Sequence, residues 1–237
     1  MKNLTSAVTL LLTIAFAVSP ALTNPFSGFL ANQLPIPQID PPIQPAGYAF
    51  SIWGLIYAWL IVSAVYGFLK RPNDQDWNAA RKPLIVSLAV GVPWLAIANA
   101  SAIWATITII IMAVGAVWSL IISPTRDRWW FQAPVGIYAG WLTAASCVSL
   151  GTTMAGYGVL ANSFGWAFIG IIIGLLVTTT VLMVGRKSPE YLMTVVWALI
   201  GIIVANGTEI LPVSILAGIG AIFLSFLAIR LARPTFH

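Results

Sequence analysis

The sequence predicts an all-α polytopic membrane protein with about eight transmembrane helices. Of its 237 residues, 59% are hydrophobic and only 7% are charged, whereas soluble domains carry about 25% charged residues. The mean hydropathy is +0.95. The apolar residues also gather in segments of about 20 residues, which is the length that a helix needs to cross about 30 Å of hydrocarbon.

Eight apolar segments follow one another along the chain. The third and fourth are separated on grounds of length, because the run from Pro83 to Ile122 carries no charge and would form one helix of about 60 Å, twice the bilayer. We expect the chain to turn back at residues 99–101. The eight segments cover residues 4–23, 47–69, 83–101, 104–122, 131–151, 164–184, 190–206 and 212–231.

The first segment has two interpretations. Lys2, the apolar stretch and the small residues near Ala17 and Ala21 are typical of a secretory signal peptide that is removed by cleavage. The segment is also long enough to span the membrane. We interpret it as a retained first helix, and cleavage of residues 1–21 stays open as the alternative.

The basic residues predict the orientation of the helices. If there are eight spans, all eleven lysine and arginine residues fall on one side of the membrane. The connections on the other side, 24–46, 102–103, 152–163 and 207–211, contain none. Because basic loops stay in the cytoplasm, we expect an inner (plasma) membrane protein of a bacterium with both termini cytoplasmic. This topology explains the net charge of +5 without a nucleic acid as partner.

The sequence lacks the residues that several kinds of site need. The single Cys147 excludes an intrachain disulfide and a cysteine cluster for zinc or iron–sulfur. The single His237 leaves no pair of imidazoles for a haem and no Ser–His arrangement within the bilayer. Glu190 and Glu209 lie at the two ends of the seventh segment, where we expect the interface to solvate them. We therefore expect no catalytic residue, no metal site, no cofactor and no enzymatic activity.

The connection between the first two segments, residues 24–46, is rich in proline. Proline removes backbone donors and favours extended structure. The connection is therefore either a stiff surface link or a lid over a cavity that opens to the outside. Its prolines are Pro25, Pro35, Pro37, Pro41, Pro42 and Pro45.

Aromatic residues mark one face of the second segment. Phe50, Trp53 and Tyr57 are spaced i, i+3 and i+7, which places them on the same side of a helix. On periodicity alone, helix–helix packing is the leading explanation. The G-x-x-x-G motifs at 136–140 and 170–174 also indicate close approach of helices.

The stretch "PAGYAFSIWGLIY", residues 45–57, resembles the second-span signature of the tryptophan-rich sensory protein family (TspO/MBR, peripheral benzodiazepine receptor-like). Its proline-rich start, Trp53, Gly54 and Tyr57 carry the match. The stretch "PLIVSLAVGVPWLAIANASAIW" is similar to the third span of the family, with Asn99 near its end. A fourth span follows without a charged break.

The fifth span of the family completes the resemblance. "APVGIYAGWLTAASCVSL" is similar to it, with Pro134, Tyr138, Trp141 and Ala145 as the matching residues. The motifs occur in the family's order, and the similarity covers about residues 1–151.

The chain also departs from the family pattern. The connection 24–46 contains no tryptophan, although the family's lid loop usually does. Ser149 stands where the fifth span often has asparagine. The resemblance implies two parts, a five-helix unit over residues 1–151 and an additional three-helix membrane region over residues 152–237, for which it offers no counterpart.

The resemblance implies a binding function. Five helices of the family surround an apolar cavity that the loop between the first two spans closes, and its ligands are tetrapyrroles such as protoporphyrin, and sterols. By resemblance Trp53 and Trp141 flank a planar ligand, and Asn99 offers a polar contact. The ligand-binding residues that we expect are Phe50, Trp53, Tyr57, Trp94, Asn99, Tyr138, Trp141 and Ala145.

We accordingly expect a membrane protein that binds a flat apolar ligand, of tetrapyrrole or sterol type, as sensor, receptor or carrier. The alternative is a transporter or permease for a small solute, which the eight-span count favours. The expected partners are the lipid bilayer and this ligand, and a second copy of the chain in a homodimer remains open.

Overall fold

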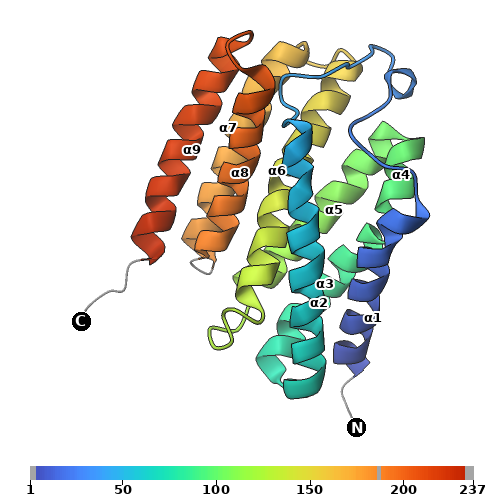
Figure 1. Ribbon diagram of the computed structural model, residues 1–237, viewed down its shortest axis with the longest axis vertical. Helices are drawn as coiled ribbons and strands as arrows, with labels where there is room; N and C mark the ends of the chain where they lie inside the picture. The colour runs from blue at the N-terminus through green and yellow to red at the C-terminus, as the bar shows by residue number, and fades with distance from the viewer. Residues whose placement is uncertain (1–3, 186–187, 233–237) are drawn as a thin grey trace.

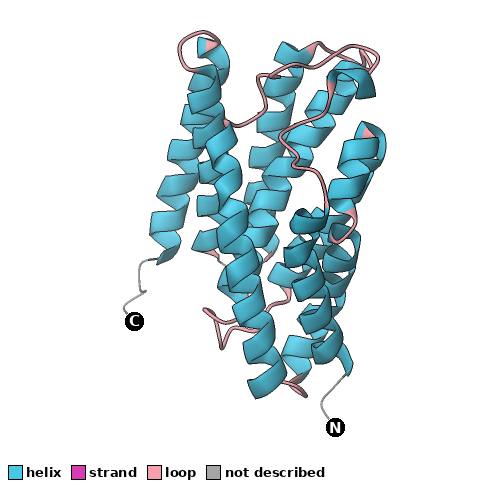
Figure 2. Cartoon of the chain, turned by 45° about the vertical axis from the view of Figure 1, so that its right-hand side comes forward, coloured by secondary structure: helices cyan, strands magenta, loops and turns pink. Residues whose placement is uncertain are grey.

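The computed structural model describes residues 4–185 and 188–232. In these residues every regular element is helical (Figures 1 and 2). The helices are α1 (Leu4–Val18), α2 (Ile52–Lys70), α3 (Gln75–Gly91), α4 (Trp94–Ala100), α5 (Ala102–Ile121), α6 (Gln132–Gly156), α7 (Ser163–Val184), α8 (Pro189–Asn206) and α9 (Leu211–Ala232), with short 3-10 turns η1 (Ser19–Leu22), η2 (Ala31–Gln33) and η3 (Gly47–Ser51).

The number of spans agrees with the sequence-based prediction. Seven helical segments are long and apolar enough to cross a membrane, and α3 with α4 makes an eighth when this bent pair is one span. The all-α polytopic fold is therefore confirmed, and the chain is an integral membrane protein.

The third span is broken rather than straight. α3 and α4 meet at a bend of 42°, where Pro93 precedes the first residue of α4 and cannot donate a backbone hydrogen bond. The span also begins before residue 83, because the Asp74 carboxylate caps α3 by accepting from the backbone N–H groups of Asp76 and Trp77. The predicted turn at residues 99–101 is confirmed, since Ser101 ends α4 and caps α5.

The arrangement of the helix ends agrees with an even number of crossings. α1 begins and α9 ends at the same, lower side of the bundle in Figure 1. The α2–α3 turn and the α5–α6 loop lie at this side too, and they carry Arg71, Arg126 and Arg128. The predicted basic residues Lys2, Arg186, Lys187 and Arg233, and the single histidine His237, lie outside the described residues.

α6 is the central helix of the bundle. Residues 131–143 are buried without exception. A Cβ atom on Gly136 or Gly140 would stand 2.6 Å from Ser188 Oγ or from the Tyr191 carbonyl oxygen of the α8 region. The close approach that the first G-x-x-x-G motif predicts is therefore present, and it brings α8 directly onto α6. The implied boundary at residue 151 falls inside α6.

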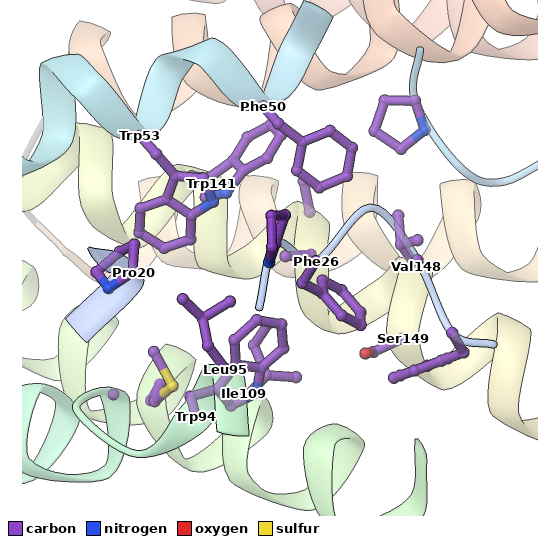
Figure 3. Close-up of a pocket in the computed structure, with 18 of the residues that line it drawn as sticks. Pro20, Phe26, Phe50, Trp53, Trp94, Leu95, Ile109, Trp141, Val148 and Ser149 are labelled. Atoms are coloured by element: carbon purple, nitrogen blue, oxygen red, sulfur yellow. The ribbon is translucent and has the colours of Figure 1, made fainter. Parts of the chain in front are cut away.

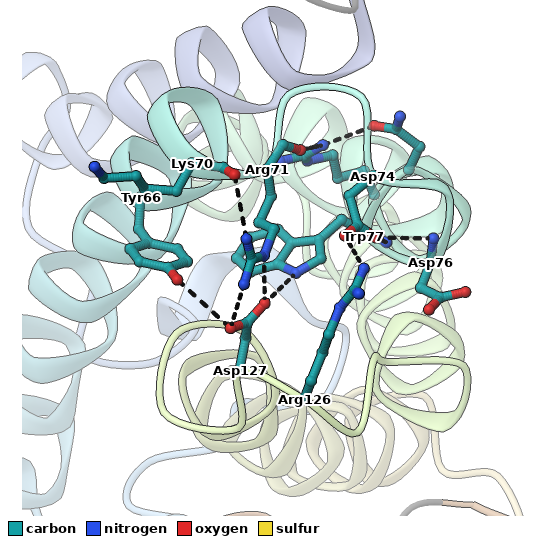
Figure 4. Close-up of polar contacts among 10 residues, drawn as sticks. Tyr66, Lys70, Arg71, Asp74, Asp76, Trp77, Arg126 and Asp127 are labelled. Carbon is teal, nitrogen blue, oxygen red and sulfur yellow. Dashed lines mark hydrogen bonds and ion pairs between the residues drawn. The ribbon is translucent and has the colours of Figure 1, made fainter.

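Asp127 holds together the basic end of the bundle. Its carboxylate accepts from Arg71 Nε at 2.8 Å, Arg71 Nη2 at 3.1 Å and Trp77 Nε1 at 3.1 Å, as Figure 4 shows. Hydrogen bonding from Arg71 lowers the pKa of Asp127 below its ordinary value, because a donor to the charged form stabilises that form. Arg126 pairs with Asp74 in the same cluster. The α5–α6 loop is thus tied to the α2–α3 turn.

The expectation for Glu190 needs correction. Its side chain is only 11% exposed and pairs with Arg128 at 2.5 Å, and Ser188 Oγ donates to its other carboxylate oxygen at 3.1 Å. Contrary to expectation, Glu190 is therefore not stabilised by water at the membrane interface. Its charge is stabilised by the ion pair with Arg128 of the α5–α6 loop. Glu209, at the other end of α8, is exposed.

Candidate functional site

A cavity of about 220 Å³ lies between α1, α2, α4, α5 and α6, beneath the connection between the first two helices. Figure 3 shows how its side chains converge from these elements. α8 also reaches it through Ala198, so that one of the C-terminal helices contributes to its wall.

Five aromatic rings form one wall of the cavity. Trp53 and Tyr57, one turn apart on α2, are stacked with centroids 5.2 Å apart and 17° between their planes. Phe16 of α1 meets both edge-on, at 5.8 and 5.3 Å. Trp141 of α6 meets Trp53 and Phe50 edge-on, at 6.3 and 5.7 Å. Such edge-to-face pairs fix one another's orientation, so the wall is built before any ligand arrives.

The opposite wall comes from α4 and α5. Trp94, Leu95 and Ile109 face the α2 aromatics across the cavity in Figure 3. The Trp94 indole N–H donates to the Ala105 carbonyl oxygen at 3.0 Å, which satisfies its one polar atom and holds the ring. Phe26 of the covering loop meets Trp94 edge-on at 5.3 Å.

The connection 24–46 covers the cavity, in agreement with its interpretation as a lid. Pro25, Phe26, Phe29 and Pro45 are among the residues that line the cavity from above. Aromatic side chains are therefore present in the lid, although they are phenylalanines rather than tryptophans.

Hydrogen bonds fasten this lid to three helices. Gln33 Nε2 donates to the Ala98 carbonyl oxygen of α4 at 2.9 Å. The Ile36 N–H donates to the Gly156 carbonyl oxygen of α6 at 2.9 Å. Asn206 Nδ2 of α8 donates to the Pro42 carbonyl oxygen at 2.8 Å. The lid therefore depends on a helix outside the five-helix unit.

Six of the eight expected ligand-binding residues line the cavity, and two do not. Asn99 Nδ2 donates to the carbonyl oxygens of Asn24 and Leu95, at 3.1 and 3.0 Å, so it holds the start of the lid. Tyr138 is fully buried, and its hydroxyl bonds with Ser87 Oγ at 2.9 Å. Tyr138 supports Phe16 from behind, at 5.7 Å. The six expected residues that do line the cavity are Phe50, Trp53, Tyr57, Trp94, Trp141 and Ala145.

Several lining residues do not belong to the predicted set. Phe16 is the one aromatic residue of α1, and it continues the buried stripe of Ser6, Thr9 and Thr13 at helical spacing, so this pattern could have indicated it. Phe26 and Phe29 stand three residues apart and are the two aromatic residues of the connection 24–46, so they could have been identified as candidates. Ala198 lies beyond the region of the resemblance.

The lining carries no ionisable carboxylate, lysine, arginine or histidine. The indole N–H groups of Trp53 and Trp141 make no hydrogen bond to another described residue. Across residues 4–185 and 188–232, no group of three His, Cys, Asp or Glu side chains could hold a metal ion. The arrangement suits an apolar ligand that stacks on aromatic rings.

Comparison with known proteins gives one match. No curated protein and no solved structure matches the chain. A family model described as TSPO-like protein matches residues 3–230, and this range includes the three C-terminal helices as well as the aromatic cavity. The chain therefore belongs to the TSPO-like protein family.

Proposed function

We propose that the protein binds a flat apolar ligand, of tetrapyrrole or sterol type, in the aromatic cavity and acts as a sensor, receptor or carrier in the membrane. The observation that carries this proposal is the wall of Phe16, Phe50, Trp53, Tyr57 and Trp141, whose rings converge from α1, η3, α2 and α6 on one cavity. Each aromatic contact adds about 0.5–1.5 kcal/mol beyond the burial of apolar area.

The size of the cavity bears on the kind of ligand. Its volume of about 220 Å³ is below the range of about 300–1,000 Å³ that is usual for ligand pockets. A small flat molecule fits it as it stands, whereas a tetrapyrrole requires the lid to move outward. The polar ties of the lid to α4, α6 and α8 are separate hydrogen bonds, each with a small net free energy of about 1 kcal/mol.

We further propose a binding role without catalysis. Acid–base chemistry needs a positioned pair of titratable groups, and the only titratable side chain among the cavity residues is Tyr57. The location that we propose is the inner membrane of a bacterium, with the basic end of the bundle in the cytoplasm.

A carrier or permease is the second candidate, and the break in the third span favours it. Gly91, Trp94 and Leu95 flank this break and line the cavity. Helices that are interrupted beside the substrate are typical of transporters. Binding alone and transport therefore use the same cavity and differ in whether its wall moves.

Two measurements test these functions. Titration of the purified protein with octaethylporphyrin, a tetrapyrrole without ionised groups, is expected to give saturable quenching of tryptophan fluorescence, and a linear, non-saturable signal would refute the binding proposal. Flux of the bound compound in proteoliposomes distinguishes a carrier, which moves it, from a sensor, which binds it without flux.

A further inference from the structure

The cavity has a polar end that the aromatic wall does not explain. Ser149 and Thr152 lie one turn apart on α6, and both line the cavity. The Ser149 hydroxyl points into it in Figure 3. The residues of this face of α6 thus pass from the indole of Trp141 through small apolar side chains to two hydroxyl groups.

The hydroxyl of Thr152 lacks a hydrogen-bond partner. The residue is 3% exposed, and its Oγ1 atom is buried without a partner. A buried hydroxyl without a partner is costly, and native structures rarely tolerate one without a reason. Ser149 Oγ likewise makes no hydrogen bond to another described residue, although its carbonyl oxygen accepts from Thr106. A ligand with one hydrogen-bonding group would complete this end of the site.

Charge further narrows the chemistry of the ligand. None of the side chains that line the cavity is cationic. The described arginine cluster, with Arg71 and Arg126, lies at the opposite end of the bundle, at the α2–α3 turn (Figures 1 and 4). An ionised carboxylate in the cavity would lose its hydration without gaining a counter-ion, and this is strongly unfavourable.

The distance between the aromatic end and the polar end of the cavity limits the length of the ligand. Eight residues of α6 separate Trp141 from Ser149, which corresponds to about 12 Å along the helix axis. We propose that the cavity selects an uncharged flat molecule whose apolar body lies against Trp53 and Trp141 and whose single hydroxyl or carbonyl group bonds with Ser149 and Thr152. This inference rests on the proposed binding function and names its ligand class.

A matched series of probes tests the inference. Pyrene, 1-pyrenemethanol and 1-pyrenecarboxylate share one flat ring system and differ only in a group that is absent, neutral or ionised at pH 7.5. We expect 1-pyrenemethanol to bind the full-length protein about fivefold more tightly than pyrene, because it supplies the missing partner. We expect 1-pyrenecarboxylate to bind at least about tenfold more weakly than pyrene. Saturable energy transfer from tryptophan gives the three affinities.

Variants assign the effect to the hydroxyl groups. Thr152→Val keeps the shape of the side chain, and in this variant the affinity for 1-pyrenemethanol should come close to that for pyrene, so that the fivefold preference is lost. Ser149→Ala provides a second, independent test of the same loss. Thr108→Val is the control, because Thr108 bonds within α5 to the Trp104 carbonyl oxygen and does not line the cavity.

The outcomes separate the two proposals. If pyrene does not bind in a saturable manner, the proposed function fails, and this inference fails with it. If pyrene binds but 1-pyrenecarboxylate binds equally well, or if both variants retain the full preference for 1-pyrenemethanol, only the present inference is refuted.

Discussion

The indole rings of Trp53 and Trp141 meet edge-to-face, with their centroids 6.3 Å apart and 84° between their planes. The two residues are 88 positions apart in the chain, and they come from α2 and α6. Trp141 is 2% exposed and is held by its neighbours, whereas Trp53 is half-buried and stacks on Tyr57. The pair joins the two helices at the site and presents an aromatic surface to the cavity.

The orientation of the bundle is open to a direct test. We expect reporter fusions after Arg71 and Arg126 to report the cytoplasm, because the basic α2–α3 turn and α5–α6 loop carry these residues and basic loops stay inside. Fusions after Gln33 and Ala161 should report the outer side. Two reversed results would refute the topology.

Close packing of α6 against α8 is expected to depend on Gly140. In Gly140→Ala the new Cβ atom would stand 2.6 Å from the Tyr191 carbonyl oxygen, a backbone atom that cannot move alone. We expect the free energy of unfolding to fall by about 1–3 kcal/mol, measured by thermal or denaturant unfolding in detergent.

Gly218→Ala is the matched control for this substitution. Gly218 also lies within a membrane helix, α9, but the nearest atom to its added Cβ is Ile203 Cδ1 at 3.9 Å. Alanine should be neutral or slightly stabilising there, because it favours the helix over glycine. Equal losses in the two variants would show that Gly140 has no special packing role.

Asp127 should make stability depend on pH. In Asp127→Asn the hydrogen bonds from Arg71 and Trp77 lose their charged acceptor, and we expect the midpoint of thermal unfolding at neutral pH to fall by about 2–4 °C. Because Arg71 lowers the pKa of Asp127 in the folded state, this stabilisation is complete above the unfolded pKa of about 3.9. It is lost as the pH falls through the lower folded pKa.

The difference between wild type and Asp127→Asn should therefore be constant near neutral pH and disappear in acid. Asp76→Asn is the control, because Asp76 is exposed. A difference that grows on acidification would contradict the role given to the Asp127 carboxylate.

Trp197 links α8 to η3, the turn that leads into α2. Its indole N–H donates to the Ala49 carbonyl oxygen at 2.9 Å, and its ring meets Tyr48 edge-on at 5.5 Å. Trp197→Phe keeps an aromatic ring but removes the donor, so we expect a loss of about 1 kcal/mol in unfolding free energy and modestly weaker ligand binding through Phe50.

Trp118→Phe serves as its control, since Trp118 is 58% exposed on α5. Unfolding of both variants in detergent, followed by helicity, separates the loss of the Trp197 hydrogen bond from the general effect of replacing a tryptophan by phenylalanine. Equal stability of Trp197→Phe and wild type would argue against a role of α8 in holding this turn.

The sequence predicted the spans well because length and hydropathy determine them. It predicted much of the aromatic wall through the resemblance of the motif around Trp53 and Tyr57 to the TspO/MBR family. Periodicity alone places both residues on one helix face, where helix–helix packing was the leading explanation. Asn99 and Tyr138 do not line the cavity, and no local pattern indicates this, because their partners, Asn24 and Ser87, come from other elements. The contribution of Ala198 depends on how α8 packs against α6, and no local pattern encodes this.

The most direct test of a ligand site at the aromatic wall is the affinity of the protein for a flat apolar ligand after loss of each tryptophan. Trp53→Ala and Trp141→Ala each remove a large apolar surface from the cavity, and we expect each to weaken binding of pyrene, the uncharged flat probe, by about 1–3 kcal/mol. Trp118→Ala should bind as the wild type does, because Trp118 does not line the cavity. Each variant is first checked for folding by gel filtration and helicity. A loss in Trp118→Ala as large as that in Trp53→Ala and Trp141→Ala, or full affinity in the latter two, would contradict the assignment of the site.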